Sequence, residues 1–338
     1  MKKLLFVLAL VLCLALCSCG GNTIEVTTAA ETTTEPEPVY FINPLNGKKL
    51  DEEYSGRVFA ITINNVSPAL PHRGLSQADI FFEMFINDYC TRGLALFSDI
   101  RSVADIGSVR SARFNFTDIS MGYNCVLIHS GGSNKVLSDL AKSGVDQFNA
   151  DNGVVGYRDK TRSANGYSSE HTLFVRGESA YNYVASKGYE LNVTGKSYGL
   201  VFAEEGTPDG QTANTVEIVF SLYGRTKYST MTYDAASDGY LFNQYGKTMT
   251  DGDKLVSFKN VIVILAPTEN IDVYHVSDLI GTGDAYFACG GKAVPCKWTR
   301  AVDTDAFSFT MADGSPVKLE AGGTYIAIAP TGSPINIF

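Results

Sequence analysis

The chain has 338 residues, with 27 Lys and Arg against 36 Asp and Glu, and its formal net charge is −9 at pH 7. An acidic balance without a basic stripe argues against a protein that holds nucleic acid through its phosphates. The length is ample for one large domain or two moderate ones. We therefore expect a sizeable hydrophobic core and no nucleic-acid partner.

The first 19 residues have the pattern of a secretory signal peptide. Lys2 and Lys3 precede an apolar run at residues 4–16, which is too short and wrongly placed for an ordinary membrane span. The segment ends Leu16-Cys17-Ser18-Cys19-Gly20, which resembles the lipobox of bacterial lipoproteins. This resemblance predicts that Cys19 is acylated, with palmitate or a similar chain, and anchors the mature protein to the membrane. The alternative is cleavage by the general signal peptidase and release.

Residues 20–38 are rich in threonine, glutamate and proline and show no apolar period. Such a composition cannot bury a core, so it predicts a disordered tether. Fully extended, about 19 residues reach at most roughly 65 Å, which is enough to hold a domain off a bilayer surface. The tether is acidic and is not expected to adhere to anionic lipid.

Residues 39–200 predict an α/β domain with a mixed sheet. Alternation of apolar residues indicates strands, and apolar residues at helical spacing followed by glycine indicate helices. The expected strands lie at residues 57–65, 79–88 and 94–100, and the expected helices at 133–143 and 178–187. Residues 148–171 are polar and predict a long loop of the kind that is often functional or mobile.

Residues 201–338 predict an antiparallel β-rich domain, because short apolar runs alternate with turn signals. The runs lie at residues 215–223, 228–233, 239–244, 260–266, 284–289, 293–299, 307–311 and 324–329. The predicted fold class is therefore α+β, with an N-terminal α/β domain and a C-terminal antiparallel β-rich domain.

Four cysteines follow the expected lipobox: Cys90, Cys125, Cys289 and Cys296. None belongs to a CxxC pair, so no metal site is expected, and no motif indicates a cofactor. Export permits a disulfide between Cys289 and Cys296, which could flank a hairpin. Their spacing leaves this open.

Two short turns stand out within residues 105–134, with a strand expected between them. The first contains Arg110, Ser111 and Arg113 at the start of an expected helix, and Ser111 is expected to be its N-cap, as Ser133 is for the helix expected after the second turn. Positive side chains at the positive end of a helix are unfavourable unless a negative group lies there. A phosphate, a carboxylate or a carboxylate of the protein itself would satisfy them.

The second turn follows the apolar run at residues 125–128 and contains His129, Ser130, Gly131 and Gly132. The two glycines allow positive φ and close approach of the backbone to a ligand. Ligands often bind where a strand ends in a turn and a helix begins. The two turns therefore predict an anion-binding cleft, and the alternative is an internal arrangement of ion pairs and turns.

Further candidates come from strand and loop positions. Glu83 lies among phenylalanines and needs a partner, so it is a candidate acid/base or the counter-ion of an arginine. His129 and His171 are candidate acid/base residues, and Arg158 and Arg162 from the polar stretch are candidate ligand-binding residues. For each of these residues a structural role is the alternative, through an ion pair or a hydrogen bond.

At this point the chain resembles a known family, the YerB-like lipoproteins. The resemblance runs through nearly the whole sequence after Tyr40 and is most specific at residues 107–113. Its other motifs are Asn64-Asn65, residues 74–80, Glu83, Thr91-Arg92, residues 129–133, Arg158, Arg162, His171, residues 281–285, Lys297-Trp298 and residues 324–330. The family usually has Pro-His-Asn where this chain has Glu170-His171-Thr172, so only His171 carries over.

The resemblance implies a two-part domain of unknown function in lipoproteins of Gram-positive bacteria, and no activity. Together with the residues it predicts a lipid-anchored protein on the extracytoplasmic face of the membrane, which binds an anionic cell-envelope ligand in an Arg/Ser/Gly-lined cleft. One alternative is an envelope-polymer hydrolase or transferase that uses Glu83, His129 or His171. Another is a scaffold for an envelope protein, with no ligand site. An enzyme is the less favoured of these predictions, and the ligand and the oligomeric state stay open.

Overall fold

The structure is a computed structural model that describes residues 40–338. The expected signal peptide at residues 1–19 and the expected tether at residues 20–38 lie outside these residues. Within residues 40–338, no helix combines the length and the apolar character needed to cross a bilayer.

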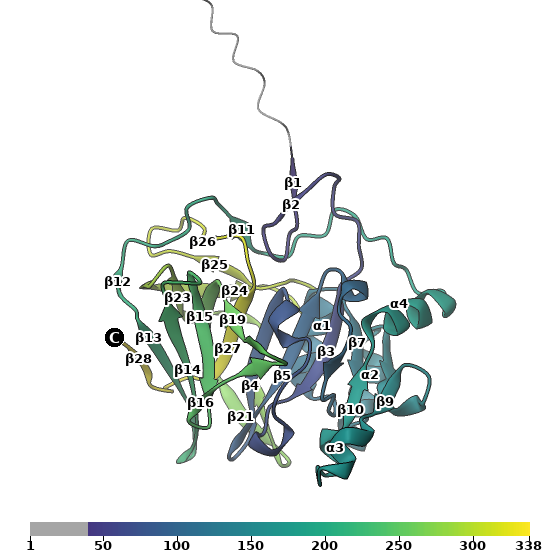
Figure 1. The fold of residues 1–338 in the computed structure, drawn as a ribbon. Coiled ribbons are helices and arrows are strands. Elements are labelled where there is room, and N and C mark those ends of the chain that lie inside the picture. Colours follow the sequence, from purple (N-terminus) through teal and green to yellow (C-terminus); the bar gives the residue numbers. More distant parts are fainter. Residues whose placement is uncertain (1–39) are drawn as a thin grey trace, which may run out of the picture. The chain divides into compact units, whose positions relative to one another are not determined.

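A central sheet of 11 strands organises the described residues (Figure 1). Ten of its strands follow one path: β12 (Gln211–Thr212), β24 (Lys292–Arg300), β23 (Gly281–Cys289), β20 (Asn260–Ala266), β27 (Thr324–Pro330), β4 (Ile80–Asn87), β5 (Cys90–Phe97), β3 (Phe59–Asn64), β7 (Val126–His129) and β8 (Gln147–Asn149). The eleventh, β25 (Ser308–Thr310), pairs with β24. Strand β27 pairs in parallel with both β20 and β4. The regions on either side of residue 200 therefore share one sheet, and their division into two domains stays a prediction.

A second sheet of six strands is antiparallel throughout. It contains β13 (Thr215–Leu222), β14 (Arg225–Asp234), β15 (Gly239–Gln244), β16 (Lys247–Thr248), β19 (Ser257–Phe258) and β28 (Ile335–Ile337). Phe81 and Phe85 of β4 pack against Phe242 and Phe220 of this sheet, with ring centroids 5.9 Å and 6.3 Å apart. Aromatic side chains on alternate positions of β4 thus join the two sheets.

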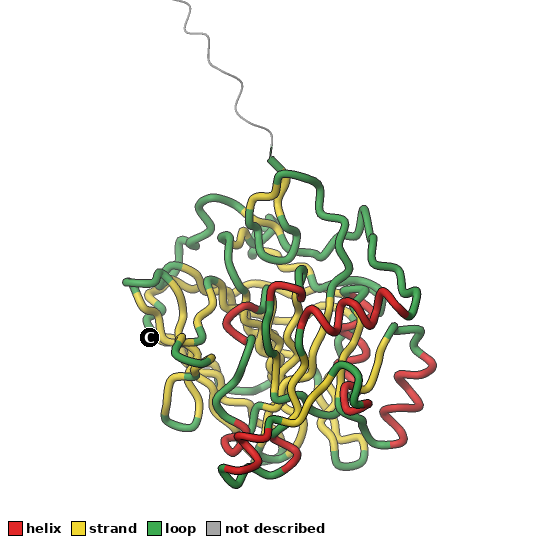
Figure 2. Tube along the Cα trace, turned by 45° about the vertical axis from the view of Figure 1, so that its right-hand side comes forward, coloured by secondary structure: helices red, strands yellow, loops and turns green. Residues whose placement is uncertain are grey.

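The helices α1 (Phe114–Gly122) and α2 (Asn134–Lys142) cover the other face of the central sheet, where Phe116 and Val136 join the core around Phe82. Two more helices, α3 (Lys160–Ala164) and α4 (Gly177–Ser186), follow (Figure 2). Five 3-10 turns complete the helical segments: η1 (Ser67–Ala69), η2 (Leu75–Gln77), η3 (Ile100–Ser102), η4 (Ala150–Asn152) and η5 (Ser169–His171).

Short strands make up the remaining regular structure. A three-stranded sheet contains β6 (Ile106–Gly107), β10 (Leu173–Val175) and β9 (Gly156–Arg158). Four pairs complete the set: β1 (Phe41–Ile42) with β2 (Lys49–Leu50), β11 (Val201–Phe202) with β26 (Lys318–Leu319), β17 (Thr250–Asp251) with β18 (Lys254–Leu255), and β21 (Thr268–Ile271) with β22 (Tyr274–Ser277). The predicted α+β class is confirmed, with a mixed sheet in the N-terminal region and mostly antiparallel pairing in the C-terminal region.

The prediction of a long loop at residues 148–171 is wrong, because this stretch contains β9, α3 and two 3-10 turns. Asp159 caps α3 by accepting hydrogen bonds from the backbone of Thr161 (2.8 Å) and Arg162 (3.1 Å). The buried guanidinium of Arg162 donates to the carbonyl oxygens of Ala69 (2.8 Å) and His171 (3.0 Å). These tertiary hydrogen bonds order a polar segment that has no apolar period of its own.

The N-cap prediction is right for one helix and wrong for the other. Ser133 accepts a hydrogen bond from the backbone of Val136 at the start of α2 (3.4 Å). Helix α1 begins instead after Arg113, which makes no side-chain cap, and not after Ser111. The reason is tertiary, because backbone hydrogen bonds to the second turn hold residues 110–112 outside the helix.

Candidate anion-binding site

The two turns singled out in the sequence lie side by side. The backbone nitrogen of Ser130 donates to the carbonyl oxygen of Arg110 (2.8 Å), and that of Ala112 donates to the carbonyl oxygen of Gly131 (2.9 Å). Gly131 has the positive φ expected for the turn, 66°, whereas Gly132 does not. These hydrogen bonds fix the backbone from which Arg110 and Arg113 extend.

A third arginine, Arg92 of β5, joins them. Its Nη1 donates to the carbonyl oxygen of Ser111 (3.1 Å), and only 4% of the residue is exposed. Arg92, Arg110 and Arg113 are called the arginine cluster below. In all three, the Nε atom is buried and has no hydrogen-bond partner among the described residues.

The arginine cluster is short of negative charge. Among residues 40–338, Glu170 is the one carboxylate that forms an ion pair with it, through Arg110 Nη2 (2.7 Å). Burial lowers the pKa of Arg92 to about 9, and the neighbouring charges of Arg113 and Arg110 act in the same direction. Burial also lowers the pKa of Arg113, and the charge of Arg110 lowers it further. Arginine is a permanent cation in proteins, so three positive groups share one carboxylate partner among residues 40–338.

The C-terminal region contributes to the same site through Tyr274 of β22. The guanidinium of Arg113 lies over the Tyr274 ring, 4.6 Å from its centroid, and Arg113 Nη1 donates to the carbonyl oxygen of Ala112 (2.7 Å). A cation–π contact of this kind orients the guanidinium without neutralising it. The position of Arg113 is therefore set while its charge stays available.

A cavity of about 600 Å³ approaches the arginine cluster through Cys90 and the neighbours of Tyr274, and the three arginines are not among its lining residues. Cys90 lines it and points to the same face of β5 as Arg92, two residues further on. Val273 and His275, on either side of Tyr274, line it as well. Burial raises the pKa of Cys90, so its thiol is neutral and does not compensate the arginines. The cavity offers space for a ligand beside the cluster.

Glu83, a leading candidate for the same cleft, lies on the other face of the sheet. Glu83 pairs in register with Gly93, whereas Met84 pairs with Arg92, so Glu83 and Arg92 point to opposite faces. The carboxylate of Glu83 is fully buried among hydrogen-bond donors: Asn65, Thr91, Lys227, Ser229 and Tyr325. The prediction that Glu83 shares a cleft with the arginines is therefore wrong.

The two candidate histidines have different surroundings. His129 Nδ1 lies 3.0 Å from the carbonyl oxygen of Gly131, and Nε2 lies 2.8 Å from Gln147 Oε1. His171 Nδ1 lies 2.9 Å from Asn64 Nδ2, and Nε2 lies 3.5 Å from Glu170 Oε1. Burial lowers the pKa of both imidazoles. Of the two, His171 lies closer to the arginine cluster, because its neighbour Glu170 pairs with Arg110.

The other candidate arginines lie outside the cluster. Arg158 pairs with Asp151 and donates to the carbonyl oxygen of Ser169. Arg162 is occupied by the backbone carbonyls described above. Arg92 was missed as a site residue, although a charged side chain inside the apolar run of β5 was the signal that could have identified it.

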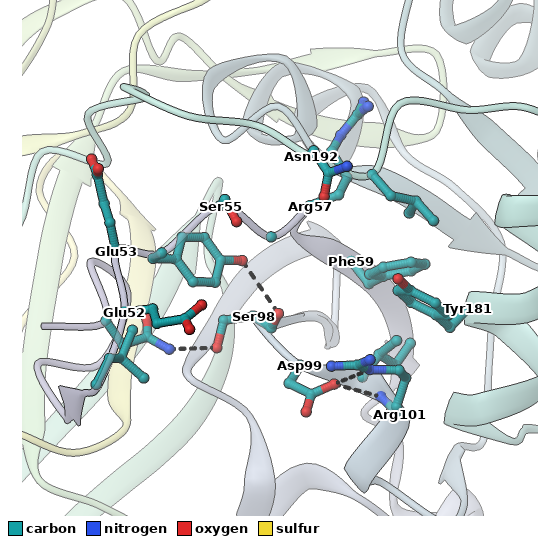
Figure 3. Close-up of a pocket in the computed structure, with 16 residues that line it drawn as sticks. Glu52, Glu53, Ser55, Arg57, Phe59, Ser98, Asp99, Arg101, Tyr181 and Asn192 are labelled. Atoms are coloured by element: carbon teal, nitrogen blue, oxygen red, sulfur yellow. Dashed lines mark hydrogen bonds and ion pairs between the residues drawn. The ribbon is translucent and has the colours of Figure 1, made fainter. Parts of the chain in front are cut away.

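A second cavity, of about 410 Å³, lies beside Tyr54 and shares no residue with the arginine cluster (Figure 3). Glu52, Glu53 and Asp99 line it together with Arg57 and Arg101, and Arg101 pairs with Asp99 (3.0 Å). Arg57 is likewise paired, with Asp146 (2.9 Å), so this lining offers no unpaired guanidinium to the predicted anionic ligand.

The four cysteines within residues 40–338 are free. Cys289 and Cys296 lie on the neighbouring strands β23 and β24, but their partners in register are Lys292 and Ala285. The offset leaves them without a disulfide in the described structure. In the same residues, no three His, Cys, Asp or Glu side chains are grouped to hold a metal ion.

The fold is that of an α+β protein in which three arginines of the N-terminal region gather, one of them against Tyr274 of the C-terminal region. The chain belongs to a family of proteins of unknown function (DUF3048): residues 45–190 match its N-terminal domain and residues 216–326 its C-terminal domain. It is 26% identical over 308 residues to "Putative lipoprotein YerB" of Bacillus subtilis, which covers 85% of this chain and 86% of the relative. The crystal structure of the YerB protein from Bacillus subtilis has a similar fold, with a TM-score of 0.75 at 24% identity over 88% of this chain and 99% of that chain.

Proposed function

We propose that this is a lipid-anchored protein on the extracytoplasmic face of a Gram-positive membrane, and that its arginine cluster binds an anionic group of a cell-envelope component. The signal-like segment that ends at Cys19 and the relative named as a lipoprotein support the location. Teichoic-acid phosphate and peptidoglycan carboxylate are envelope groups of suitable charge.

The observation that carries the proposal is the shortage of negative partners around three arginines. Removing a charge from water is costly, and buried charges are normally paired. Here Arg92 is almost fully buried and makes no ion pair within residues 40–338. Guanidinium groups bind phosphate and carboxylate through paired, charge-assisted hydrogen bonds. An anionic ligand would therefore supply the negative charge that the arginines lack among the described residues.

An envelope hydrolase or transferase is the second candidate, and one contact favours it. The His171–Glu170 pair, 3.5 Å apart, lies beside the arginines as an acid–base pair would. The buried environment of Glu83 and the two neighbours of His129 argue against those residues as acid or base. A scaffold without a ligand would instead need the arginines to be matched internally.

Replacing Arg113 with glutamine is expected to weaken binding to purified Gram-positive cell walls roughly tenfold or more. The reason is that a hydrogen bond to a charged group contributes about 1.5–3 kcal/mol. The measurement is cosedimentation of the full-length protein, in a neutral detergent, with the walls at increasing salt. Glutamine is shorter than arginine, keeps one amide donor, and removes the charge together with the cation–π contact to Tyr274.

Arg101→Gln is the matched control, because Arg101 pairs with Asp99 at the other cavity and is half-exposed. This variant should bind like the wild type. If Arg113→Gln binds the walls as tightly as Arg101→Gln does, the arginine cluster is structural and the proposal fails. A thermal unfolding midpoint close to that of the wild type would show that Arg113→Gln is folded.

Replacing Cys19 with alanine is expected to move the protein from the membrane fraction to the soluble fraction and to abolish incorporation of labelled palmitate. The lipobox places the acyl chains on that thiol, and two or more chains are needed for stable anchoring. Cys17→Ala is the control, because Cys17 lies outside the expected acceptor position and should leave anchoring unchanged. If Cys17→Ala loses the label and Cys19→Ala keeps it, then Cys17 is the acylated residue and the assignment to Cys19 is wrong.

A further inference from the structure

We infer that the arginine cluster selects a doubly charged phosphate group, and that Glu170 occupies the place of one of its oxygens. This inference rests on the proposed function and names the chemical class of the ligand. The charge balance of the site, the chemistry of the anion and the position of Glu170 each support it.

The charge balance leaves the site with two positive charges in excess. Arg92, Arg110 and Arg113 supply three, and Glu170 is the one carboxylate in ion-pair contact with them within the described residues. The remaining ionisable neighbours are neutral at neutral pH, because burial lowers the pKa of His171 and raises that of Cys90. A doubly charged group compensates more of this excess than a singly charged group does, whether Glu170 stays in place or is displaced.

A phosphomonoester fits this balance better than a carboxylate or a phosphodiester. It carries about −1.5 to −2 charges at pH 7 and has three strong acceptor oxygens. Arginine forks bind such oxygens in pairs. A carboxylate and a phosphodiester each carry one charge and have two charged oxygens.

Glu170 marks where one anionic oxygen lies. Its Oε2 accepts from Arg110 Nη2 at 2.7 Å, and its side chain is 46% exposed on the 3-10 turn η5. The other oxygen, Oε1, lies 3.5 Å from His171 Nε2. A carboxylate held by one arginine at the surface is weakly bound, because exposed ion pairs contribute only about 0–1 kcal/mol. A stronger anion can therefore displace it.

The neighbouring cavity has room for the group that carries the phosphate. Two of its lining residues are acidic, but each has a basic partner: Asp88 lies 3.7 Å from Arg225 Nε, and Asp272 lies 3.2 Å from Lys135 Nζ. Their charges are thus compensated locally and do not add to the balance at the arginines.

The test is isothermal titration of the full-length protein, in a neutral detergent at pH 7.5, with three probes of similar size. Phenyl phosphate carries two charges, whereas methyl phenyl phosphate and benzoate carry one each. Phenyl phosphate is expected to bind roughly tenfold tighter than either of the others, which corresponds to about 1.4 kcal/mol. Equal affinities would overturn the selection of a doubly charged group.

Replacing Glu170 with glutamine tests the second half of the inference. Phenyl phosphate is expected to bind Glu170→Gln up to about fivefold tighter than the wild type, because the internal competitor loses its charge and an exposed pair contributes at most about 1 kcal/mol. Asp284→Asn is the matched control, since Asp284 forms a similar exposed pair with Lys297 on β23 and β24, and it should leave the affinity unchanged. Unchanged or weaker binding by Glu170→Gln would show that Glu170 supports the site and does not stand in for a ligand.

The outcomes separate this inference from the proposed function. If all three probes bind equally and Arg113→Gln weakens all of them, the arginine cluster binds anions and only the selectivity is refuted. If no probe binds and Arg113→Gln still sediments with cell walls, both proposals fail. The comparison of probes on the wild type remains decisive even if Glu170→Gln does not fold.

Discussion

Replacing Lys227 with methionine is expected to lower the free energy of unfolding by about 3–5 kcal/mol, as is typical when one partner of a buried ion pair is removed. Lys227 and Glu83 form an ion pair in which their side chains are 4% and 0% exposed. Lys227 Nζ also donates to Ser229 Oγ and to Gln244 Oε1 (2.9 Å). Methionine keeps the length of the side chain and leaves the Glu83 carboxylate without its counter-ion.

The effect should be large because this network joins the two sheets. Glu83 lies on β4 of the central sheet, whereas Lys227 and Ser229 lie on β14 of the second sheet. Tyr325 of β27 donates to the other oxygen of Glu83. Burial lowers the pKa of Lys227, and the charge of Glu83 opposes that shift. Each charge is therefore tolerated in the core only while the other is present.

The measurement is urea unfolding of the full-length protein and of Lys227→Met under the same detergent conditions. Lys297→Met is the matched control, because Lys297 pairs with Asp284 where the two side chains are 57% and 69% exposed. An exposed pair contributes about 0–1 kcal/mol, so this variant should unfold almost like the wild type. A loss below 1 kcal/mol in Lys227→Met would refute the role assigned to the network. Adding Glu83→Gln to Lys227→Met should recover part of the loss, since the unpaired charge is then gone.

Acidification from pH 6.5 to pH 4 is expected to cost about 3 kcal/mol of stability through His72 alone. His72 is fully buried, and neither of its ring nitrogens has a hydrogen-bond partner in the part of the chain that the structure describes. Burial lowers its pKa from 6.5 to about 4; the charges of Arg162 and Lys227 act in the same direction, and those of Asp251 and Glu83 oppose it. Below pH 6.5 the unfolded chain binds a proton that the folded protein excludes. Stability is therefore full above pH 6.5 and is lost as the pH falls towards 4.

The check is the free energy of unfolding measured between pH 8 and pH 4 for the wild type and for His72→Leu. Leucine has a similar volume and cannot be protonated, so the curve of the variant should be flatter over this range. Some dependence will remain, because burial lowers the pKa of His129, His171 and His275 as well. Parallel curves for the two proteins would show that His72 is protonated in the folded protein or is not buried.

The local sequence pattern was sufficient to predict most of the helices and strands. The runs predicted at residues 239–244 and 260–266 coincide with β15 and β20, and the helix predicted at residues 133–143 is α2 with Ser133 as its cap. Alternation, helical spacing and caps depend on neighbours a few residues apart, so the sequence displays them directly. Residues 148–171 are ordered by hydrogen bonds from Arg162 to distant partners, so their local pattern wrongly predicted a loop.

The candidate site was predicted in part. The turns that contain Arg110 and Gly131 are adjacent because helix α1 leads away from the first turn and strand β7 returns to the second. Arg92 was not assigned to the site, and Glu83 was assigned to the wrong face. Both errors concern the register of β4 against β5, which decides the face to which each side chain points.

The sequence by itself determined the periodicity of the strands and helices, the acidic charge, and the export and anchoring signal that predicts the location. Only the tertiary structure decided that β27 lies between β20 and β4, so that strands from both regions form one sheet. It also decided that Arg92, Arg113 and Tyr274 meet. The physical reason is that pairings between strands more than 200 residues apart depend on which faces pack together in the whole core, and no local pattern records that choice.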